Sequence, residues 1–183
     1  MSRMLWVLRH GKSSWKDPAL RDEDRPLAKR GRRDVPRVAA WLRERGVVPD
    51  AVVSSPAKRA WQTAERFCGA LGCDVDVRYD ERVYAATCDA LLEVLADAPS
   101  RARHVLLVGH NPGLEELVEV LCGSPTPSSP DEKMLPTAAL VGVDLPDDWR
   151  ALRREAGRMC WLVRPRSLRG VREEASTGIV GSV

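Results

Sequence analysis

The sequence predicts an α/β fold, a three-layer α/β/α sandwich on a mainly parallel central sheet. Short apolar runs without helical periodicity, typical of strands buried on both faces, alternate along the chain with segments of helical periodicity. The 183 residues, 44% hydrophobic and 30% charged, are enough for one soluble domain with a substantial core. Strands that alternate with helices form a parallel sheet with helices on both faces.

The first buried strand is expected within residues 5–8. A polar loop over the end of this strand, residues 12–25, separates it from a helix expected within residues 28–45. Pro36 falls in the middle of that helix. Either Asp34 caps a new helix with Pro36 in its first turn, or the helix is kinked.

The next strand, residues 51–54, is followed by a second helix. Ser55 is expected to cap this helix and Pro56 to occupy its first helical position, and the helix should end near Leu71. Polar and apolar residues alternate over residues 74–79, which predicts a strand near an edge of the sheet.

The remaining elements continue the same order. A helix over residues 89–97 precedes a buried strand, residues 104–109, and Asn111 is expected to cap the helix that follows. Two further strands, residues 138–143 and 158–163, complete the sheet. Three tryptophans are expected in the core: Trp6, Trp41 and Trp161.

We expect one domain, residues 1–164, and a C-terminal tail, residues 165–183. The tail is polar and glycine-containing without periodicity, so it is expected to be flexible. Residues 124–130 contain three prolines and three serines, which predicts a surface loop.

Composition excludes several classes of function. A net charge of +3, with basic residues spread along the chain, does not indicate nucleic-acid binding. The five cysteines form no CxxC or CxxH pair, which favours reduced thiols and a cytoplasmic protein. The first ten residues lack a signal peptide's apolar centre, and no apolar run approaches the roughly 20 residues that span a bilayer. No membrane partner is therefore expected.

Three buried strands are each followed by polar residues and then by the start of a helix. The first supplies Arg9 and His10, the second Arg59, and the third His110 and Asn111. The carboxyl ends of parallel strands share one edge of a sheet, so two imidazoles and two guanidiniums should converge there. Guanidinium groups and helix N-termini bind phosphate well, and without an anion these groups would repel one another.

This arrangement predicts phosphoryl chemistry at His10. A neutral imidazole can attack phosphorus and later leave to water, and Gly11 leaves room around the ring. His110 is expected to hydrogen-bond a phosphoryl oxygen. No acidic cluster lies beside the strand ends, so neither a metal nor a cofactor is predicted, and the arginines should neutralise the phosphate charge.

Three ordered motifs carry a resemblance to a known family: Leu8-Arg9-His10-Gly11, Ser54-Ser55-Pro56 with Arg59-Ala60 and Gln62-Thr63-Ala64, and Gly109-His110-Asn111-Pro112. Together they resemble the histidine phosphatase superfamily, also called the phosphoglycerate-mutase-like or RHG family. A further segment, Asp24-Arg25-Pro26-Leu27 followed by Gly31, narrows the resemblance to SixA-like phosphohistidine phosphatases, which are small and lack a large cap domain. The likeness covers about residues 3–163.

The resemblance implies a phosphohistidine intermediate on His10, with Arg9, Arg59 and His110 completing the phosphate pocket. The segment Asp80-Glu81-Arg82-Val83-Tyr84 resembles the one that carries the proton donor in the mutase-like branch. Glu81 is therefore the candidate general acid, the alternative being a solvated loop carboxylate.

Four further residues are candidates for substrate binding: Gly11, Ser14, Arg25 and Asn111. Lys12 and Ser13 share the loop of Ser14 and are weaker candidates, and Trp15 could form a wall of the pocket.

The favoured function is a metal-independent phosphatase that acts on phosphohistidine in a protein partner. An imidazole leaving group, with a pKa near 6.5, needs far less help from a general acid than an alkoxide does. A phosphomonoesterase for a small metabolite is the second hypothesis. A non-catalytic phosphate-binding adaptor is the third, and the presence of both histidines and both arginines argues against it.

Overall fold

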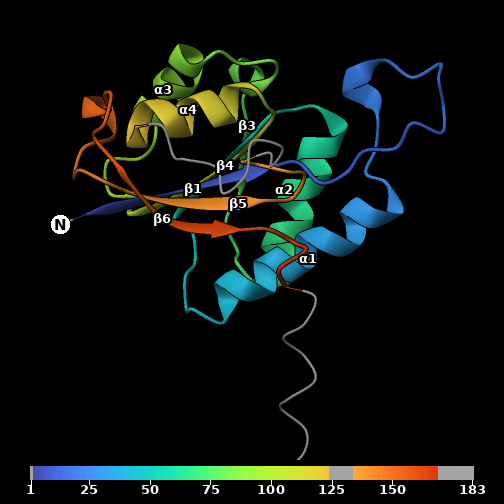
Figure 1. Cartoon of the computed structure of the whole chain (residues 1–183), viewed down its shortest axis with the longest axis horizontal. Helices are drawn as coiled ribbons and strands as arrows, with labels where there is room; N and C mark the ends of the chain where they lie inside the picture. Colours follow the sequence, from blue (N-terminus) through green and yellow to red (C-terminus); the bar gives the residue numbers. More distant parts are fainter. Residues whose placement is uncertain (1, 124–133, 169–183) are drawn as a thin grey trace, which may run out of the picture.

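The fold is built on a six-stranded sheet in the order β3-β2-β4-β1-β5-β6 (Figure 1). The computed structural model describes residues 2–123 and 134–168. Four strands are parallel to one another: β1 (Arg3–Arg9), β2 (Ala51–Ser54), β3 (Val77–Tyr79) and β4 (His104–Gly109). On the far side of β1, β5 (Leu140–Leu145) and β6 (Arg158–Val163) are each antiparallel to the preceding strand of the sheet. The predicted mainly parallel sheet is confirmed, with β3 at its edge.

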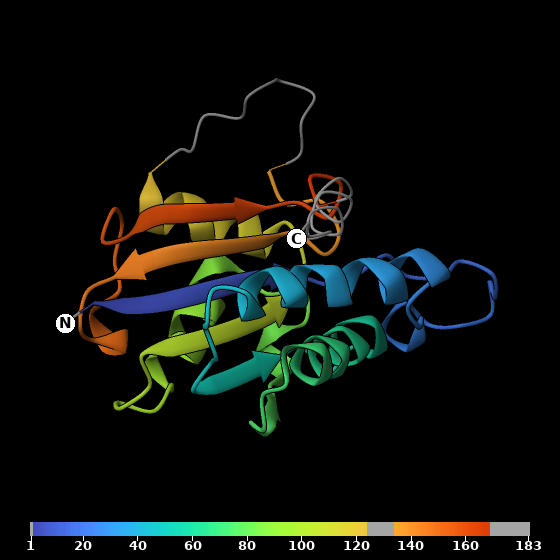
Figure 2. The same ribbon diagram turned by 90° about the horizontal axis from the view of Figure 1, so that it is seen from below.

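Helices cover both faces of the sheet. In the described residues, α1 (Lys29–Arg43) and α2 (Lys58–Leu71) pack on one face, and α3 (Cys88–Ala96) and α4 (Gly113–Cys122) on the other (Figures 1 and 2). Short 3₁₀ turns lie in the connections: η1 (Asp22–Asp24), η2 (Glu81–Val83) and η3 (Trp149–Ala151). This confirms the predicted three-layer α/β/α sandwich.

The apolar run in β1 reflects a strand buried on both faces. Leu5 and Val7 belong to the core beneath α3 and α4, whereas Trp6 and Leu8 belong to the core beneath α1 and α2. Because successive side chains of a strand point to opposite faces, a strand between two helical layers is apolar at every position. Because β1 packs against both cores, the position of its C-terminal end, from which the site residues follow, is fixed by the sheet.

Helix α1 runs unbroken through Pro36. Asp34 does not cap a new helix, because its buried carboxylate is held inside α1 by ion pairs with three arginines of the same helix: Arg30, Arg33 and Arg37. The interpretation in which Asp34 starts a second helix is therefore wrong.

Two predicted helix caps are also wrong. Helix α2 begins at Lys58, later than expected, and Ser55 lies before it in the loop. Helix α4 begins at Gly113 and its N-cap position is held by Pro112, so Asn111 lies before the cap, where its Nδ2 donates to the carbonyl of Leu135 at 3.1 Å. In both loops the polar side chain bonds to a residue that is distant in the sequence, and the local sequence pattern does not reveal such a contact.

The three tryptophans that were predicted to lie in the core differ in their burial. Trp6 is buried as predicted, and Trp41 is half-buried. Trp161 is 44% exposed, so its placement in the core was wrong. It lies on the edge strand β6, where the ring of Trp41 contacts it edge-on at 5.4 Å between centroids but leaves the rest of it open.

Two sequence predictions concern segments that are described only in part. The surface loop over residues 124–130 lies outside the described residues, as does the tail from residue 169. Residues 165–168 are described, and Leu168 packs against the core beneath α1 and α2. Within the described part of the chain, every helix is too short or too polar to cross a membrane.

Candidate active site

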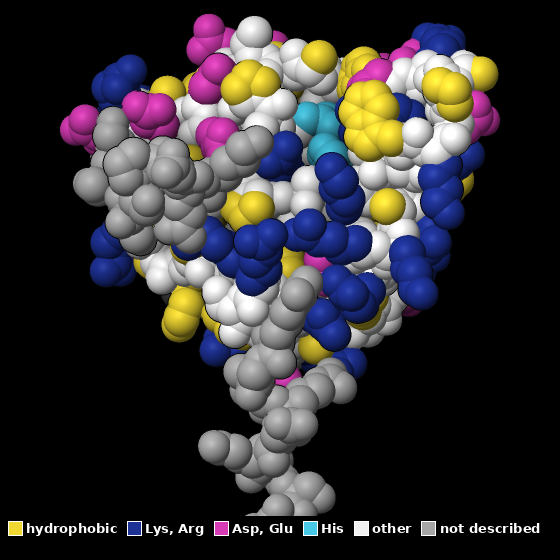
Figure 3. Space-filling model, turned by 45° about the vertical axis from the view of Figure 1, so that its right-hand side comes forward, with side chains coloured by type: hydrophobic (Ala, Val, Ile, Leu, Met, Phe, Trp, Pro, Cys, Tyr) yellow, Lys and Arg dark blue, Asp and Glu magenta, His cyan; other side chains and the backbone are white. Residues whose placement is uncertain are grey.

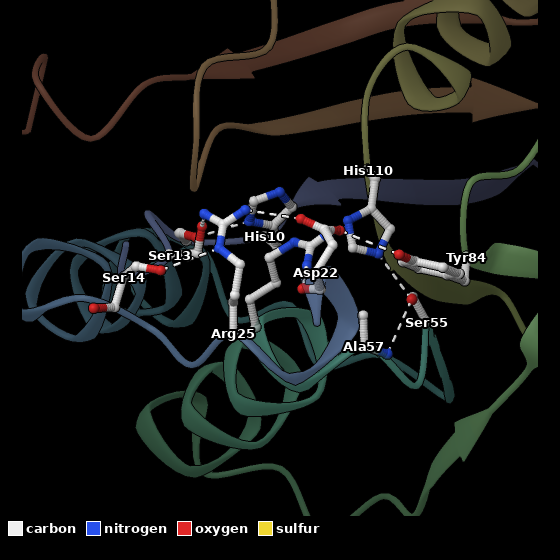
Figure 4. Close-up of polar contacts among 11 residues, drawn as sticks. His10, Ser13, Ser14, Asp22, Arg25, Ser55, Ala57, Tyr84 and His110 are labelled. Atoms are coloured by element: carbon white, nitrogen blue, oxygen red, sulfur yellow. Dashed lines mark hydrogen bonds and ion pairs between the residues drawn. The ribbon is translucent and has the colours of Figure 1, made fainter. Parts of the chain in front are cut away.

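Three strand ends converge at one edge of the sheet. In the register of the sheet Arg9 pairs with Gly109, and Ser54 pairs with Val108, so β1, β4 and β2 end side by side. His10 follows β1 and His110 follows β4, and their ring centroids lie 5.0 Å apart (Figure 4). We call the group formed by Arg9, His10, Arg59 and His110 the cup. Figure 3 shows one point of the surface where histidine side chains are visible, with lysine and arginine side chains gathered beside them.

The ring of His10 is fixed by its own neighbour. Its Nδ1 lies 2.8 Å from the carbonyl oxygen of Gly11, and the side chain is buried. A carbonyl can only accept, so Nδ1 carries the proton and donates it. The other ring nitrogen, Nε2, therefore bears the free lone pair of a nucleophile.

The ring of His110 is held in the opposite tautomer. Its Nε2 lies 2.8 Å from Oγ of Ser55, and that hydroxyl oxygen accepts a hydrogen bond from the backbone N–H of Ala57 at 3.2 Å (Figure 4). The hydroxyl proton of Ser55 is then available for Nε2, which leaves the proton of His110 on Nδ1. Among the described residues this buried Nδ1 has no partner, so it can donate to a ligand. The sequence identified Ser55 only as a cap.

Burial keeps both imidazoles neutral. Desolvation lowers the pKa of His10 to about 4, against the opposing effect of the Gly11 hydrogen bond, and repulsion from Arg59 and Arg9 lowers it further. Desolvation likewise lowers the pKa of His110 to about 3, with repulsion from His10 and Arg59 adding to it. At neutral pH the cup thus combines permanently charged guanidiniums with uncharged rings.

These pKa values predict a loss of stability in mild acid. The unfolded chain binds protons at histidine near pH 6.5, whereas His10 and His110 resist protonation until about pH 4 and 3. The unfolded state therefore binds more protons between these limits, and stability should fall as the pH falls from 6.5. We expect a loss of roughly 2 kcal/mol per histidine between pH 6.5 and 5.

Urea unfolding at these two pH values measures this effect. A variant with both His10→Asn and His110→Asn is the control, because it should lose less stability than the wild type over the same range. Equal losses in the two proteins would show that other groups cause the acid sensitivity.

Asp22 is the main residue that sequence reasoning missed. It lies in η1, within the loop after β1, and its carboxylate contacts Nη2 of Arg59 at 2.7 Å and Nη1 of Arg25 at 2.8 Å. The hydroxyl of Tyr84 donates to the same carboxylate at 3.1 Å. In the sequence this aspartate stands in a run of charged residues with nothing to single it out.

Arg25 lies beside the cup and is held by its own loop. Its guanidinium donates to Oγ of Ser13 at 2.7 Å and to the carbonyl of Ser14 at 3.1 Å. The hydroxyl of Ser14 instead accepts from the N–H of Lys16 and points away from the cup (Figure 4). Trp15 is 72% exposed, and its ring stacks on Arg25 at 3.2 Å.

Gly11 positions the cup through its backbone. Its N–H donates to Oγ1 of Thr63 at 2.9 Å, and that hydroxyl donates to the carbonyl of Arg59 at 2.6 Å. A Cβ on Gly11 would meet Leu27 and Val35 at 3.0 Å. The missing side chain therefore allows α1 to approach, rather than a ligand as expected. Thr63 lies on the buried face of α2, where its polar role could not be read from the sequence.

The close approach of α1 predicts a stability effect. A Cβ on Gly31 would lie 2.5 Å from the carbonyl oxygen and 2.9 Å from the nitrogen of Lys12, next to the loop that holds His10. Backbone atoms cannot move aside easily, so Gly31→Ala should cost about 1–3 kcal/mol of unfolding free energy. It should also lower activity by displacing the loop.

Gly69→Ala is the matched control for Gly31→Ala. Gly69 also lies within a helix, but a Cβ there would meet no atom within 4 Å. We expect this change to stabilise the protein by about 0.5–1 kcal/mol. Urea unfolding measures both, and equal effects at the two glycines would contradict the packing argument.

Arg9 and Asn111 share one backbone acceptor. The carbonyl of Leu135 accepts from Nη1 of Arg9 at 2.7 Å and from Nδ2 of Asn111 at 3.1 Å. Burial lowers the pKa of Arg9, partly offset by Glu115. In the described part of the chain, Nε of Arg9 and Oδ1 of Asn111 are buried without a partner. Nε is thus a second unused donor at the cup.

Glu81 lies beside the cup rather than in it. Its side chain is exposed in η2 and lines a neighbouring pocket of about 520 Å³ together with Tyr84, Lys58 and Trp61. In the free protein Glu81 therefore has the position of a solvated loop carboxylate, which was the alternative to its role as general acid. In the described residues, no three side chains of the types that bind metals come together.

Comparison with known proteins agrees with this geometry. The family model of the histidine phosphatase superfamily (branch 1) matches residues 5–84. The solved structure of the protein histidine phosphatase SixA complexed with tungstate is 25% identical, with a TM-score of 0.76 over 90% of this chain and 99% of that one. This chain belongs to the histidine phosphatase superfamily. It lies in the SixA-like branch.

Three further proteins are similar to this chain in sequence or in fold. A protein from Nakamurella multipartitia, provisionally described as phosphohistidine phosphatase SixA, is 26% identical with a TM-score of 0.76, covering 90% of this chain and 97% of that one. An uncharacterized Mycobacterium tuberculosis protein is 34% identical over 146 residues, 78% of this chain and 89% of its own. A mycobacterial glucosyl-3-phosphoglycerate phosphatase is 20% identical with a TM-score of 0.61, covering 87% of this chain and 98% of that one, and shares the fold alone.

Proposed function

We propose that this histidine phosphatase is a phosphohistidine phosphatase that acts on a protein and works without a metal through a phosphohistidine intermediate on His10. The observation that carries the proposal is the hydrogen bond at 2.8 Å between Nδ1 of His10 and the carbonyl of Gly11. It aims an unprotonated Nε2 into the cup, and the low pKa keeps that nitrogen neutral.

The reaction proceeds in two transfers at Nε2 of His10. The lone pair of Nε2 attacks phosphorus, an N–P bond forms, and the bond between phosphorus and the leaving group breaks. Water then attacks the phosphohistidine, the N–P bond breaks, and inorganic phosphate leaves with His10 restored. Splitting the hydrolysis in this way replaces one difficult step with two easier ones.

The equatorial oxygens of the phosphoryl group are neutralised by the chain's own donors. Arg59 supplies a guanidinium fork, and two buried donors without partners among the described residues, Nδ1 of His110 and Nε of Arg9, suit the remaining oxygens. Fixed donors in a buried site stabilise developing charge without having to reorganise. The similar SixA protein was solved as a complex with tungstate, an oxyanion, which supports an oxyanion as the kind of ligand for this chain.

The position of Glu81 supports a phosphohistidine substrate. An imidazole leaving group departs with little help from an acid, whereas an alkoxide requires a proton donor near the bond that breaks. Glu81 is exposed and lines the pocket beside the cup. The free site is therefore better suited to the easier leaving group.

A small phosphomonoester is the second candidate substrate. The pocket of about 520 Å³ beside the cup, lined by Trp61, Tyr84 and Lys58, offers room for a compact leaving group. Glu81 would then be the general acid.

Comparison of three substrates tests these proposals. The wild type and Glu81→Gln are assayed on an aryl phosphate, an alkyl phosphate and a phosphohistidine-containing protein. We expect kcat/KM to be highest on the phosphohistidine protein and to be unaffected there by Glu81→Gln. If the alkyl phosphate were the best substrate and Glu81→Gln reduced its kcat by about 10²-fold or more, the small-molecule function would replace the proposed one.

A further inference from the structure

The carboxylate of Asp22 lies in the cup among the groups that would bind a phosphoryl group. Oδ2 accepts hydrogen bonds from Nη2 of Arg59 at 2.7 Å and from the hydroxyl of Tyr84 at 3.1 Å (Figure 4). Nη1 of Arg59 also donates to the backbone carbonyl of Asp22 at 2.5 Å. One residue thus engages both terminal nitrogens of the guanidinium that the phosphoryl group requires.

Asp22 supplies the anion that this group of cations needs. Burial raises the pKa of Asp22, but the hydrogen bond and charge of Arg59, together with hydrogen bonds from Tyr84 and Arg25, outweigh it and hold the pKa below its usual value, so the carboxylate is charged at neutral pH. Its charge also acts on His10 and His110. A phosphoryl dianion that entered while Asp22 stayed would place two anions on one guanidinium, where they repel each other.

The contacts indicate which partner can move. The side chains of Arg59 and Arg25 are only 8% exposed, whereas that of Asp22 is 51% exposed. No residue of η1 is buried, so apolar packing does not hold the turn. The cations are therefore fixed, and the carboxylate is attached mainly through the contacts it makes with them.

We propose that Asp22 is a built-in counter-anion that the phosphoryl group of the substrate must displace, and that this competition makes the cup selective for dianionic phosphoryl groups. The inference rests on the proposed function, because it requires the cup to be the phosphoryl site. On displacement, η1 moves away from Arg59. The neighbouring pocket changes shape as it does, because Arg21, Glu23 and Asp24 line that pocket.

Because the Asp22 carboxylate already contacts Arg59 and Arg25, another anion binds there only if it interacts with these arginines more strongly than Asp22 does. A monoanion such as acetate offers the arginines no more than the tethered carboxylate already provides. A phosphoryl group offers three oxygens and a second charge, and so can replace it. If Asp22 occupies the cup for about 90% of the time, the apparent affinity for a competing anion is about tenfold below the intrinsic one.

Calorimetric titration of the full chain with inorganic phosphate, and separately with acetate, tests this inference. Asp22→Asn keeps the shape of the side chain and removes its charge, and Asp22→Ala removes the contacts as well. We expect both to bind phosphate about tenfold more tightly than the wild type and to bind acetate measurably. Asp17→Asn is the matched control, because it makes the same charge change in the same loop at an exposed carboxylate that accepts from the N–H of Ala19, and it should change either affinity less than about twofold.

The other outcomes would overturn the inference. Weaker phosphate binding by both Asp22 variants would show that Asp22 holds Arg59 in place for the ligand. Unchanged affinity, with kcat reduced on an alkyl but not on an aryl phosphate, would show that Asp22 is a proton donor. If phosphate bound to none of the proteins, the proposed phosphoryl site itself would be wrong. That result is distinct from phosphate binding to the wild type with no gain in affinity in the variants.

Discussion

Replacing His10 by alanine is expected to reduce kcat by at least about 10⁴-fold on every phosphorylated substrate, because it removes the atom that accepts the phosphoryl group. The other groups of the cup would still bind the substrate, so KM should change far less than kcat. The fold should persist, since His10 stands at the end of β1 and not among the apolar residues of either core. Steady-state kinetics on an aryl phosphate and a thermal melt measure the two effects.

His104→Ala is the matched control for this prediction. His104 begins β4 at the opposite end of the sheet, where its Nδ1 accepts a hydrogen bond from Nε1 of Trp6 at 3.3 Å. Its loss should affect stability and leave kcat within about twofold of the wild type. A His10→Ala variant that kept turnover within about tenfold of the wild type would remove His10 from the role of nucleophile.

Replacing Arg59 by lysine is expected to reduce kcat/KM by about 10²- to 10³-fold even though the positive charge remains. Lysine is a point charge and cannot present two parallel N–H groups to a phosphoryl group. The backbone link from the carbonyl of Arg59 to Thr63 and Gly11 does not involve the side chain, so the position of His10 should be preserved. The loss should therefore come from the phosphoryl contacts.

Arg66→Lys provides the matched control on the same helix. Arg66 lies in α2 and is exposed, so this change should alter kcat/KM by less than about twofold. If Arg59→Lys were equally silent, the guanidinium fork would have no part in the reaction. The same kinetic assay with one substrate serves both variants.

The sequence was sufficient to predict the three strands whose ends carry the site residues. The apolar runs that end at Arg9, at Ser54 and at Gly109 are strands buried on both faces, and their periodicity identifies them without tertiary information. Parallel strands then have to end at one edge, so the convergence of His10 and His110 followed from topology.

The positions of loop residues could not be predicted in the same way. Asp22 meets Arg59 across 37 positions of the chain, and Gly11 meets Thr63 across 52. Such contacts depend on how a loop folds over the sheet edge, and no local pattern in the sequence encodes them. For the same reason the sequence predicts a helix cap at Asn111, whereas its side-chain amide donates to the carbonyl of Leu135.

Asp22 also resolves a difficulty that the sequence raised. A cup of arginines and histidines should repel itself unless an anion is present. The structure relieves this repulsion in two ways, through burial, which keeps His10 and His110 uncharged, and through the Asp22 carboxylate, which contacts Arg59.

Trapping the covalent intermediate shows which side chain accepts the phosphoryl group. The wild type and His10→Ala are mixed with a phosphodonor labelled on phosphorus, quenched in alkali within milliseconds, and the labelled protein is digested and mapped. We expect an alkali-stable, acid-labile phosphoryl group on His10 of the wild type, with no label on the variant. Label on any other residue, or rapid turnover by the wild type with no labelled protein at any time, would contradict it.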